Sequence, residues 1–184
     1  MIKHQVDLVK SNHHKPVKEI VLRVLWYFLW TFTASWTPRF FNPWRIFLLK
    51  CFGAKIGKIL ILGSVWIDMP WNLSVGDFTA IGKRVWIYNF AKVDIGSNTV
   101  ISQDTTICTA SHDYEHPHMT LFWQPIIIEN QVWVGADCFL MPGIKIEEGA
   151  VIGARSLVTK DMPSWMVCAG SPCKPIKKRV IRPI

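Results

Sequence analysis

The feature that most constrains this chain is a six-residue repeat, in which each step begins with an aliphatic side chain. From residue 128 onward these leading positions are, in order, Ile128, Val134, Leu140, Ile146, Ile152 and Val158. Three further hexads upstream are led by Ile95, Ile101 and Ile107. A period of six fits neither a helix nor the simple alternation of a strand. The spacing therefore indicates a structural repeat rather than an ordinary globular pattern.

A six-residue spacing predicts a coil of triangular cross-section, in which each side is a short strand with one aliphatic side chain pointing inward. Small residues stand two positions before several leaders and leave room inside a narrow prism: Thr99, Thr105, Cys138 and Ala150. Glycine often follows the leader, as in Ile81-Gly82 and Val134-Gly135, and we expect it to let the corner turn. Stacked coils bury a continuous aliphatic column, so the expected fold is mainly β.

The repeat is interrupted in two places, and loops that interrupt a regular scaffold often carry function. The first break, within residues 81–95, contains the sequence Tyr88-Asn89-Phe90. The second, within residues 107–128, contains Ser111-His112-Asp113-Tyr114. We therefore expect the functional site at these breaks.

His112 closes the hexad ICTASH, so we expect it to leave the prism at a corner and face solvent or a neighbouring subunit. An imidazole titrates near neutral pH and can take a proton from an attacking hydroxyl, which makes His112 the candidate general base. The spacing of His112 and His116, with His118 close behind, raises a metal site as an alternative. Pro117 argues against a helical zinc motif, and we expect no metal. The remaining histidines precede the repeat: His4, His13 and His14.

Aromatic and polar side chains at the breaks are the candidates for binding a saccharide. Asn89 can orient a sugar hydroxyl, and the flanking Tyr88 can stack on a pyranose face. A turn asparagine that satisfies its own backbone fits the same pattern. Trp71, in the sequence Pro70-Trp71-Asn72, is either a sugar platform or part of a broken coil corner. Asp113, next to the candidate base, completes the predicted acceptor residues.

Composition narrows the class of protein and of partner. Half of the 184 residues are hydrophobic and 18% are charged, which excludes a disordered chain. A net charge of +8 favours an anionic partner such as nucleic acid, a membrane surface or a phosphate-bearing cofactor. The C-terminal stretch SPCKPIKKRVIRPI is strongly basic. It can pair with cofactor phosphates beside the last coil or remain a solvated tail.

Residues 20–36 are almost entirely apolar, with Arg23 as the one charge, and Pro38 ends any helix soon after. The segment is shorter than the roughly 20 residues of a spanning helix. Three interpretations remain open: a helix packed on its own protein or a partner subunit, an interfacial membrane helix, and a membrane span. The preceding residues contain no apolar stretch of a secretory signal, so we expect a cytoplasmic location, with membrane association left open.

The five cysteines are odd in number and match no zinc or redox motif. We expect them to be reduced, and Cys108 and Cys138 to be small core residues.

Several motifs together resemble the left-handed parallel β-helix acyltransferases of the hexapeptide-repeat class, which include the maltose, galactoside and serine acetyltransferases. The hexads, SHDY, PGIKI, VIGARSLVTKDMP and AGSPCKPI carry this resemblance. FGAKIG, PWNL and ISQDTTICTASHDY are most similar to acetyltransferases of colanic acid and other exopolysaccharide biosynthesis.

The resemblance implies an O-acetyltransferase that moves an acetyl group from acetyl-CoA to a saccharide hydroxyl within a ternary complex. It implies His112 as the base, Asn89 as a sugar contact, and a homotrimer with sites between neighbouring prisms. No nucleic-acid partner is expected. The implied coenzyme A contacts are Trp133, Ala136, Gly153, Ala154, Thr159, Lys160, Lys174 and Lys177.

The expected organisation has three parts. Residues 1–50 form an N-terminal segment with an apolar helix, residues 51–165 the β-helix catalytic domain with a loop at 112–125, and residues 166–184 a basic C-terminal tail. Two other functions remain open. One is a γ-type carbonic anhydrase with zinc held by three histidines across a subunit boundary, and the other is a non-catalytic trimeric scaffold.

Overall fold

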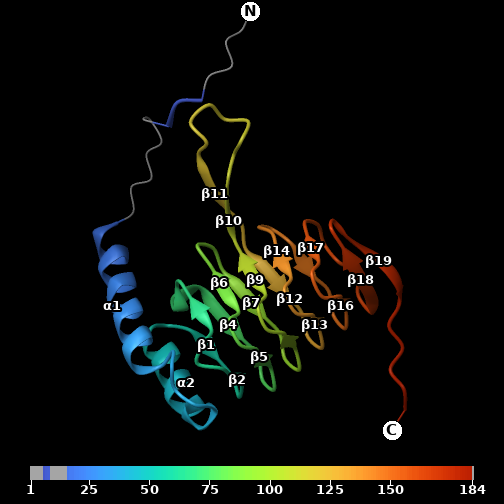
Figure 1. Ribbon diagram of the computed structural model, residues 1–184, viewed down its shortest axis with the longest axis horizontal. Helices are drawn as coiled ribbons and strands as arrows, with labels where there is room; N and C mark the ends of the chain where they lie inside the picture. The colour runs from blue at the N-terminus through green and yellow to red at the C-terminus, as the bar shows by residue number, and fades with distance from the viewer. Residues whose placement is uncertain (1–5, 9–15, 184) are drawn as a thin grey trace, which may run out of the picture.

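The computed structural model describes residues 6–8 and 16–183, so that His4, His13 and His14 lie outside it. The main body is a three-sided solenoid of short strands, with helices at one end and a hairpin arm projecting from one edge (Figure 1). The chain visits three sheets, here A, B and C, in a fixed order, with one strand in each sheet per turn. This confirms the expected fold class, a single-stranded left-handed parallel β-helix.

The strands of each sheet stack along the solenoid axis. Sheet A contains β1 (Lys55–Ile56), β4 (Leu73–Val75), β7 (Val93–Ile95), β12 (Ile126–Ile128) and β15 (Lys145–Ile146). Sheet B contains β2 (Leu60–Ile61), β5 (Ala80–Ile81), β8 (Val100–Ile101), β13 (Trp133–Val134), β16 (Val151–Ile152), β18 (Met166–Gly170) and β19 (Cys173–Lys178). Sheet C contains β3 (Trp66–Ile67), β6 (Trp86–Tyr88), β9 (Thr106–Cys108), β14 (Phe139–Leu140) and β17 (Leu157–Val158).

The predicted aliphatic leaders form the core, because each lies directly opposite the leader of the next coil. In sheet B, Ile81 pairs with Ile101, and Val134 pairs with both Ile101 and Ile152. All four side chains are buried. Cys168 pairs with Ile152 and closes this column as a fully buried thiol. The repeat thus places one buried side chain per side of the prism in successive coils, as the six-residue spacing predicts.

Two of the cysteine predictions have different outcomes. Cys138 is buried as predicted, but Cys108 is only half-buried, so the prediction of a core residue is wrong for it. Cys108 follows the inward-pointing leader Ile107, and alternation along the strand turns its side chain outward.

The glycines of the repeat do not turn the corners by left-handed backbone, and that expectation is wrong. The positive φ falls on the residue two positions later, for example on Arg84 after Gly82 and on Asp137 after Gly135. Glycine is required for space instead: a Cβ at Gly82 would lie 2.7 Å from the backbone nitrogen of Gln103 in the next coil. Close stacking of coils, rather than turn conformation, therefore explains these glycines.

Two helices, α1 (Val17–Thr33) and α2 (Asn42–Cys51), close the end of the solenoid at the first coil, with the 3-10 turn η2 (Arg39–Phe41) before α2. The indole N–H groups of Trp26 and Trp30 donate to the carbonyls of Ile67 and Val65, at 2.6 and 2.9 Å. Both indoles are buried. The apolar segment therefore packs on its own protein, as the first of the three interpretations proposed. Such a cap covers backbone groups that a preceding coil would otherwise bind.

Polar side chains complete this cap. The Asn42 amide accepts from the Ile61 N–H at 2.9 Å and donates to the Ile59 carbonyl at 2.7 Å, so it stands in for a neighbouring strand. The buried Arg45 guanidinium donates to the carbonyl of Ile61 and to the Thr37 hydroxyl. Within residues 6–8 and 16–183, no helix combines the length and apolar character needed to cross a membrane.

The opposite end of the solenoid is closed by the β18–β19 hairpin. Strand β18 continues sheet B in parallel with β16, and β19 returns antiparallel to it. Part of the stretch predicted as a basic tail is thus a strand, since residues 173–178 find hydrogen-bonding partners on the last coil.

Candidate functional site

The breaks in the repeat gather at one edge of the prism, where sheet C passes into sheet A; we call it the C/A edge. The leaders that flank this edge are Ile67 and Val75 in the first coil, then Ile87 and Ile95, then Ile107 and Ile128. These steps of 8, 8 and 21 residues replace the usual six. The longer connections of three successive coils are therefore neighbours in space. They carry Trp71, Tyr88 and His112.

His112 lies at the base of the arm, which is a hairpin of β10 (Ala110–His112) and β11 (Leu121–Trp123). Its side chain is exposed, as expected for a residue that leaves the prism at a corner. The imidazole Nδ1 lies 2.7 Å from the carbonyl oxygen of Met119. Met119 has a left-handed φ of 44°, and its N–H donates to the His116 carbonyl at 2.9 Å. A tight turn thus holds the carbonyl that orients the imidazole.

This contact decides which nitrogen can act as a base. A carbonyl oxygen can only accept a hydrogen bond, so Nδ1 of His112 must carry the proton in the Met119 contact. In the neutral ring Nε2 is then the basic nitrogen, and its direction is set by the same contact. The arrangement supplies an oriented, solvent-accessible imidazole, which general base catalysis requires.

Asn89 has the geometry of a structural asparagine. Its side chain is fully buried. Its Oδ1 accepts from the Met69 N–H at 2.9 Å, and its Nδ2 donates to the Met69 carbonyl at 2.7 Å. The alternative that the sequence left open was a turn asparagine bonded to its own backbone; the structure instead bonds the amide to the backbone of Met69, 20 residues earlier. A sugar cannot reach this amide without displacing both bonds.

The other predicted acceptor residues are accessible and lie at the C/A edge. Trp71 is half-exposed in the 3-10 turn η3 (Pro70–Asn72), so the PWN sequence does break a coil corner. Tyr88 is half-exposed at the end of β6, and its ring lies 4.7 Å from that of Phe90. Asp113 is exposed, and its carboxylate accepts from the Glu115 N–H in a local turn.

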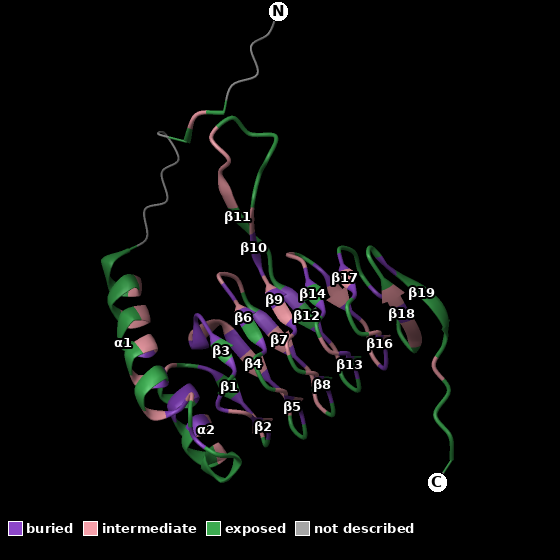
Figure 2. Ribbon diagram, viewed as in Figure 1, coloured by how far each residue is buried: buried purple, intermediate pink, exposed green. Residues whose placement is uncertain are grey.

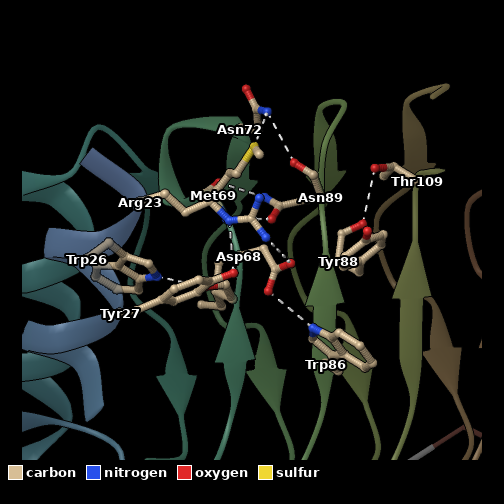
Figure 3. Close-up of polar contacts among 11 residues, drawn as sticks. Arg23, Trp26, Tyr27, Asp68, Met69, Asn72, Trp86, Tyr88, Asn89 and Thr109 are labelled. Atoms are coloured by element: carbon tan, nitrogen blue, oxygen red, sulfur yellow. Dashed lines mark hydrogen bonds and ion pairs between the residues drawn. The ribbon is translucent and has the colours of Figure 1, made fainter. Parts of the chain in front are cut away.

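A polar cluster beside this edge was not predicted from the sequence (Figure 3). Arg23 of α1 reaches sheet C, where its Nη2 lies 3.6 Å from Oδ2 of the nearly buried Asp68. The guanidinium lies over the rings of Tyr27 and Phe90, at 5.4 and 5.1 Å from their centroids. The Trp86 indole donates to Asp68 at 3.3 Å. The sequence did contain a sign of this cluster: Arg23 is the one charge in an apolar segment, and a charge taken out of water needs a partner.

Two phenols of this cluster remain neutral at physiological pH. Burial raises the pKa of Tyr27 to about 12, with the Asp68 carboxylate adding to the effect. Burial also raises the pKa of Tyr88, again helped by the negative charge of Asp68. Neutral phenols can both donate and accept hydrogen bonds.

The predicted coenzyme A contacts fall mainly at the edge where sheet B passes into sheet C; we call it the B/C edge. Ala136 follows β13 and Ala154 follows β16, and the Arg155 N–H donates to the Ala136 carbonyl at 2.9 Å. A Cβ at Gly153 would lie 2.8 Å from the Ala169 Cβ. Trp133 is exposed on β13, and its indole donates to the Ser102 hydroxyl.

The remaining predicted coenzyme A contacts lie in different places. Lys174 is exposed on β19 opposite Ala169, and so lies beside the B/C edge. Lys177, also exposed, lies opposite Val167. Thr159 and Lys160 are exposed after β17 and therefore lie at the C/A edge of the fifth coil. Within one chain, the residues predicted to contact coenzyme A therefore lie at two different edges.

The metal site considered as an alternative around His112, His116 and His118 has no set of ligands in the part of the chain that the structure describes. No group of three or more His, Cys, Asp or Glu side chains there could hold a metal ion. The rings of His116 and His118 contact each other, with centroids 5.4 Å apart.

Comparison with known proteins identifies the family. The family model "Bacterial transferase hexapeptide (six repeats)" matches residues 125–160. WcaF of Escherichia coli (strain K12), named as a colanic acid biosynthesis acetyltransferase, is 42% identical over 157 residues, which are 85% of this chain and 86% of WcaF. Galactoside O-acetyltransferase of the same strain is 33% identical over 140 residues, 71% of this chain and 66% of the enzyme.

The fold is also shared with a solved structure. The hexapeptide-repeat acetyltransferase VCA0836 of Vibrio cholerae O1 biovar eltor, complexed with acetyl coenzyme A, superposes with a TM-score of 0.80 at 24% identity. The match covers 95% of this chain and 97% of that chain. The resemblance stated from the motifs is confirmed by these sequence relatives.

Proposed function

Because this chain belongs to the hexapeptide-repeat acetyltransferases, we propose that it transfers an acetyl group from acetyl-CoA to a saccharide hydroxyl with His112 as general base. The observation that carries this proposal is the 2.7 Å contact between His112 Nδ1 and the Met119 carbonyl. In that contact Nδ1 carries a proton, so in the neutral ring Nε2 is the nitrogen that accepts one.

The chemistry follows from that tautomer. Nε2 of His112 takes the proton of the acceptor hydroxyl as the oxygen attacks the thioester carbonyl. The bond from the acyl carbon to sulfur breaks, and coenzyme A leaves as the thiolate, which the imidazolium can protonate. The Met119 carbonyl stabilises the charged ring that forms between these steps.

For the donor, we propose the B/C edge. Ala136, Gly153 and Ala154 leave a surface without large side chains, along which a pantetheine arm can lie. Trp133 flanks that surface, and Lys174 supplies positive charge for the phosphates. The similar fold of the Vibrio cholerae enzyme binds acetyl coenzyme A, which supports a thioester donor.

For the acceptor, we propose the C/A edge beside the arm. Trp71 and Tyr88 offer aromatic faces for a sugar ring, and Asp113 lies next to the base. Asn89 is not part of this proposal, since its amide is buried against Met69. The names of the relatives support a saccharide: one acetylates a galactoside, and another is assigned to colanic acid biosynthesis.

The division of residues between two edges favours a homotrimer. Sheet C separates His112 from Ala136 and Ala154 within one chain. A complete site forms when the C/A edge of one protomer faces the B/C edge of the next. Three identical contacts of this kind close a ring.

The test is thiol release from acetyl-CoA against a panel of glycosides and nucleotide sugars, with purified protein. We expect His112→Ala to lower kcat by about 10²- to 10⁴-fold, while the affinity for coenzyme A stays unchanged. His116→Ala is the matched control, because His116 lies exposed on the same arm. Loss of activity in both variants alike, or its survival in His112→Ala, would refute the assignment of the base.

A further inference from the structure

The outward surface of the helical cap is apolar. Along α1 the residues spaced three or four apart on this side share one stripe. Val24, Phe28 and Phe32 are 62%, 60% and 64% exposed. The surface, which we call the cap face, consists of exposed side chains of α1, α2 and the connection between them: Ile20, Val21, Val24, Leu25, Phe28, Phe32, Trp36, Phe40, Trp44 and Phe47.

The cap face is continuous between the two helices. The Trp44 indole donates to the Thr33 carbonyl at 3.0 Å, so that α2 touches the end of α1. The Trp36 indole donates to the Phe32 carbonyl at 3.0 Å. Phe28 and Phe32 pack on each other with centroids 4.8 Å apart. Exposed apolar side chains that adjoin in this way form an interaction surface rather than scattered contacts.

The fold does not need these side chains. The opposite side of α1 holds the solenoid through Trp26 and Trp30, which are buried and hydrogen-bonded to the first coil. Figure 2 shows the same division, with exposed segments on the outer side of α1 and α2 and buried ones toward the coils. The apolar character of the outer side therefore indicates a partner that excludes water.

Charge identifies the kind of partner. Glu19 is the sole acidic residue among residues 16–51, whereas Lys18, Arg39 and Lys50 are exposed cations. A hollow of about 670 Å³ borders the cap face, and Trp36, Arg39, Lys83 and Arg84 contribute to its lining. Apolar and aromatic side chains rimmed by cations suit an anionic lipid surface.

We propose that the cap face docks on the surface of an anionic lipid bilayer. Helix α1 lies parallel to the membrane plane, with Val24, Phe28 and Phe32 inserted to the level of the acyl chains. Trp36 lies at headgroup depth, where tryptophan is enriched. Arg39 pairs with lipid phosphates. A second copy is a poor occupant, because pairing two cap faces would bring like cations together.

The position of the cap at the end of the solenoid suits this docking. Helix α1 lies at the end of the stack, beside the first coil (Figure 1). In a trimer of prisms set side by side, three cap faces would point the same way and bind one membrane together. This last step rests on the proposed homotrimer, whereas docking of a single cap face does not.

Flotation of the purified full chain with vesicles tests the proposal without any substrate, so its outcome is independent of the acetyltransferase assignment. We expect binding to vesicles of phosphatidylcholine with phosphatidylglycerol, and at least tenfold weaker binding to phosphatidylcholine alone. The variant V24Q/F28Q/F32Q is expected to lose binding at least tenfold. Its circular dichroism should match the parent chain, since all three side chains are exposed.

The matched control is I176Q/V180Q/I181Q, which removes exposed apolar side chains on and after β19, at the opposite end of the solenoid, and is expected to bind as the parent does. Equal loss in both triple variants, or no binding by the parent chain, overturns the proposal. Sedimentation in the absence of lipid provides the other decisive result. If V24Q/F28Q/F32Q dissociates an assembly of the parent chain and leaves vesicle binding intact, the cap face is an interface between copies.

Discussion

The two edges that flank sheet C are built to opposite rules. At the B/C edge every coil passes from one aliphatic leader to the next in six residues, from Ile61 to Ile67 in the first coil through Ile152 to Val158 in the fifth. At the C/A edge the same passage takes 8, 8 and 21 residues in the first three coils. One edge therefore keeps the repeat, and the other accommodates every large departure from it.

The difference shows how a repeat protein can hold a site without losing its core. Added residues at an edge bulge outward, while the leaders on either side stay opposite their partners, as Ile95 does between Val75 and Ile128. The regular edge is shaped by backbone packed on backbone, with exposed ion pairs between neighbouring coils, such as Arg155 with Asp137. The irregular edge is shaped by side chains and offers polar groups and an imidazole.

The largest expected effect on stability tests the irregular edge. Asn89→Ala removes both side-chain bonds to the Met69 backbone in a buried place. We expect a loss of about 2–3 kcal/mol in the free energy of unfolding, since a buried unsatisfied polar group costs about 1–3 kcal/mol. Urea unfolding measures this loss. Asn72→Ala is the control and should lose less, because Asn72 is half-exposed.

Catalysis separates the two roles of Asn89. If the Asn89 amide only shapes the edge, it does not contact the acceptor, and the KM for the acceptor stays within about twofold of the parent value at temperatures where the variant is folded. A twofold change in KM corresponds to less than about half a kcal/mol. A rise in acceptor KM without a loss of stability would return Asn89 to the acceptor site and break the comparison between the edges.

The regular edge responds to volume rather than to backbone conformation. Gly82→Ala would place a Cβ 2.7 Å from the Gln103 nitrogen, and we expect a loss of about 1–3 kcal/mol from overpacking. Arg155→Gly at the same edge replaces a residue with a φ of 59°. It should change stability by less than about 1 kcal/mol, because glycine adopts this conformation readily. A Gly82→Ala variant as stable as the parent would show that the coils can accept the added volume and would refute the packing explanation.

Much of the prism could be predicted because the six-residue period specifies it directly. Ile128, Val134 and Leu140 are buried at the positions that the period gives them. The role of the glycines could not be predicted, since neighbouring coils approach only after the chain has closed three sides. A glycine that relieves a clash and one that permits a positive φ look the same in sequence.

The candidate site was predicted in part. The break around His112 is visible as a lost register, and the structure confirms that this residue leaves the prism. The hydrogen bond that His112 donates to the Met119 carbonyl was not predictable, because it depends on how an irregular arm folds back on itself. Asp68 was missed for a related reason: its partner Arg23 lies 45 residues earlier in the sequence and meets it only through packing of α1.

The smallest expected effect concerns the donor at the regular edge. Lys174→Gln removes an exposed charge beside the B/C edge, and an exposed ion pair contributes about 0.2–1 kcal/mol. We therefore expect the KM for acetyl-CoA to rise by at most about fivefold with kcat nearly unchanged, more at low ionic strength than at high. Lys58→Gln is the control, because Lys58 is also exposed but lies between β1 and β2, where sheet A passes into sheet B. A change in kcat alone would place Lys174 near the reacting atoms. Equal effects of both variants on the KM would mean that the basic chain attracts the anionic cofactor as a whole, with no specific role for Lys174.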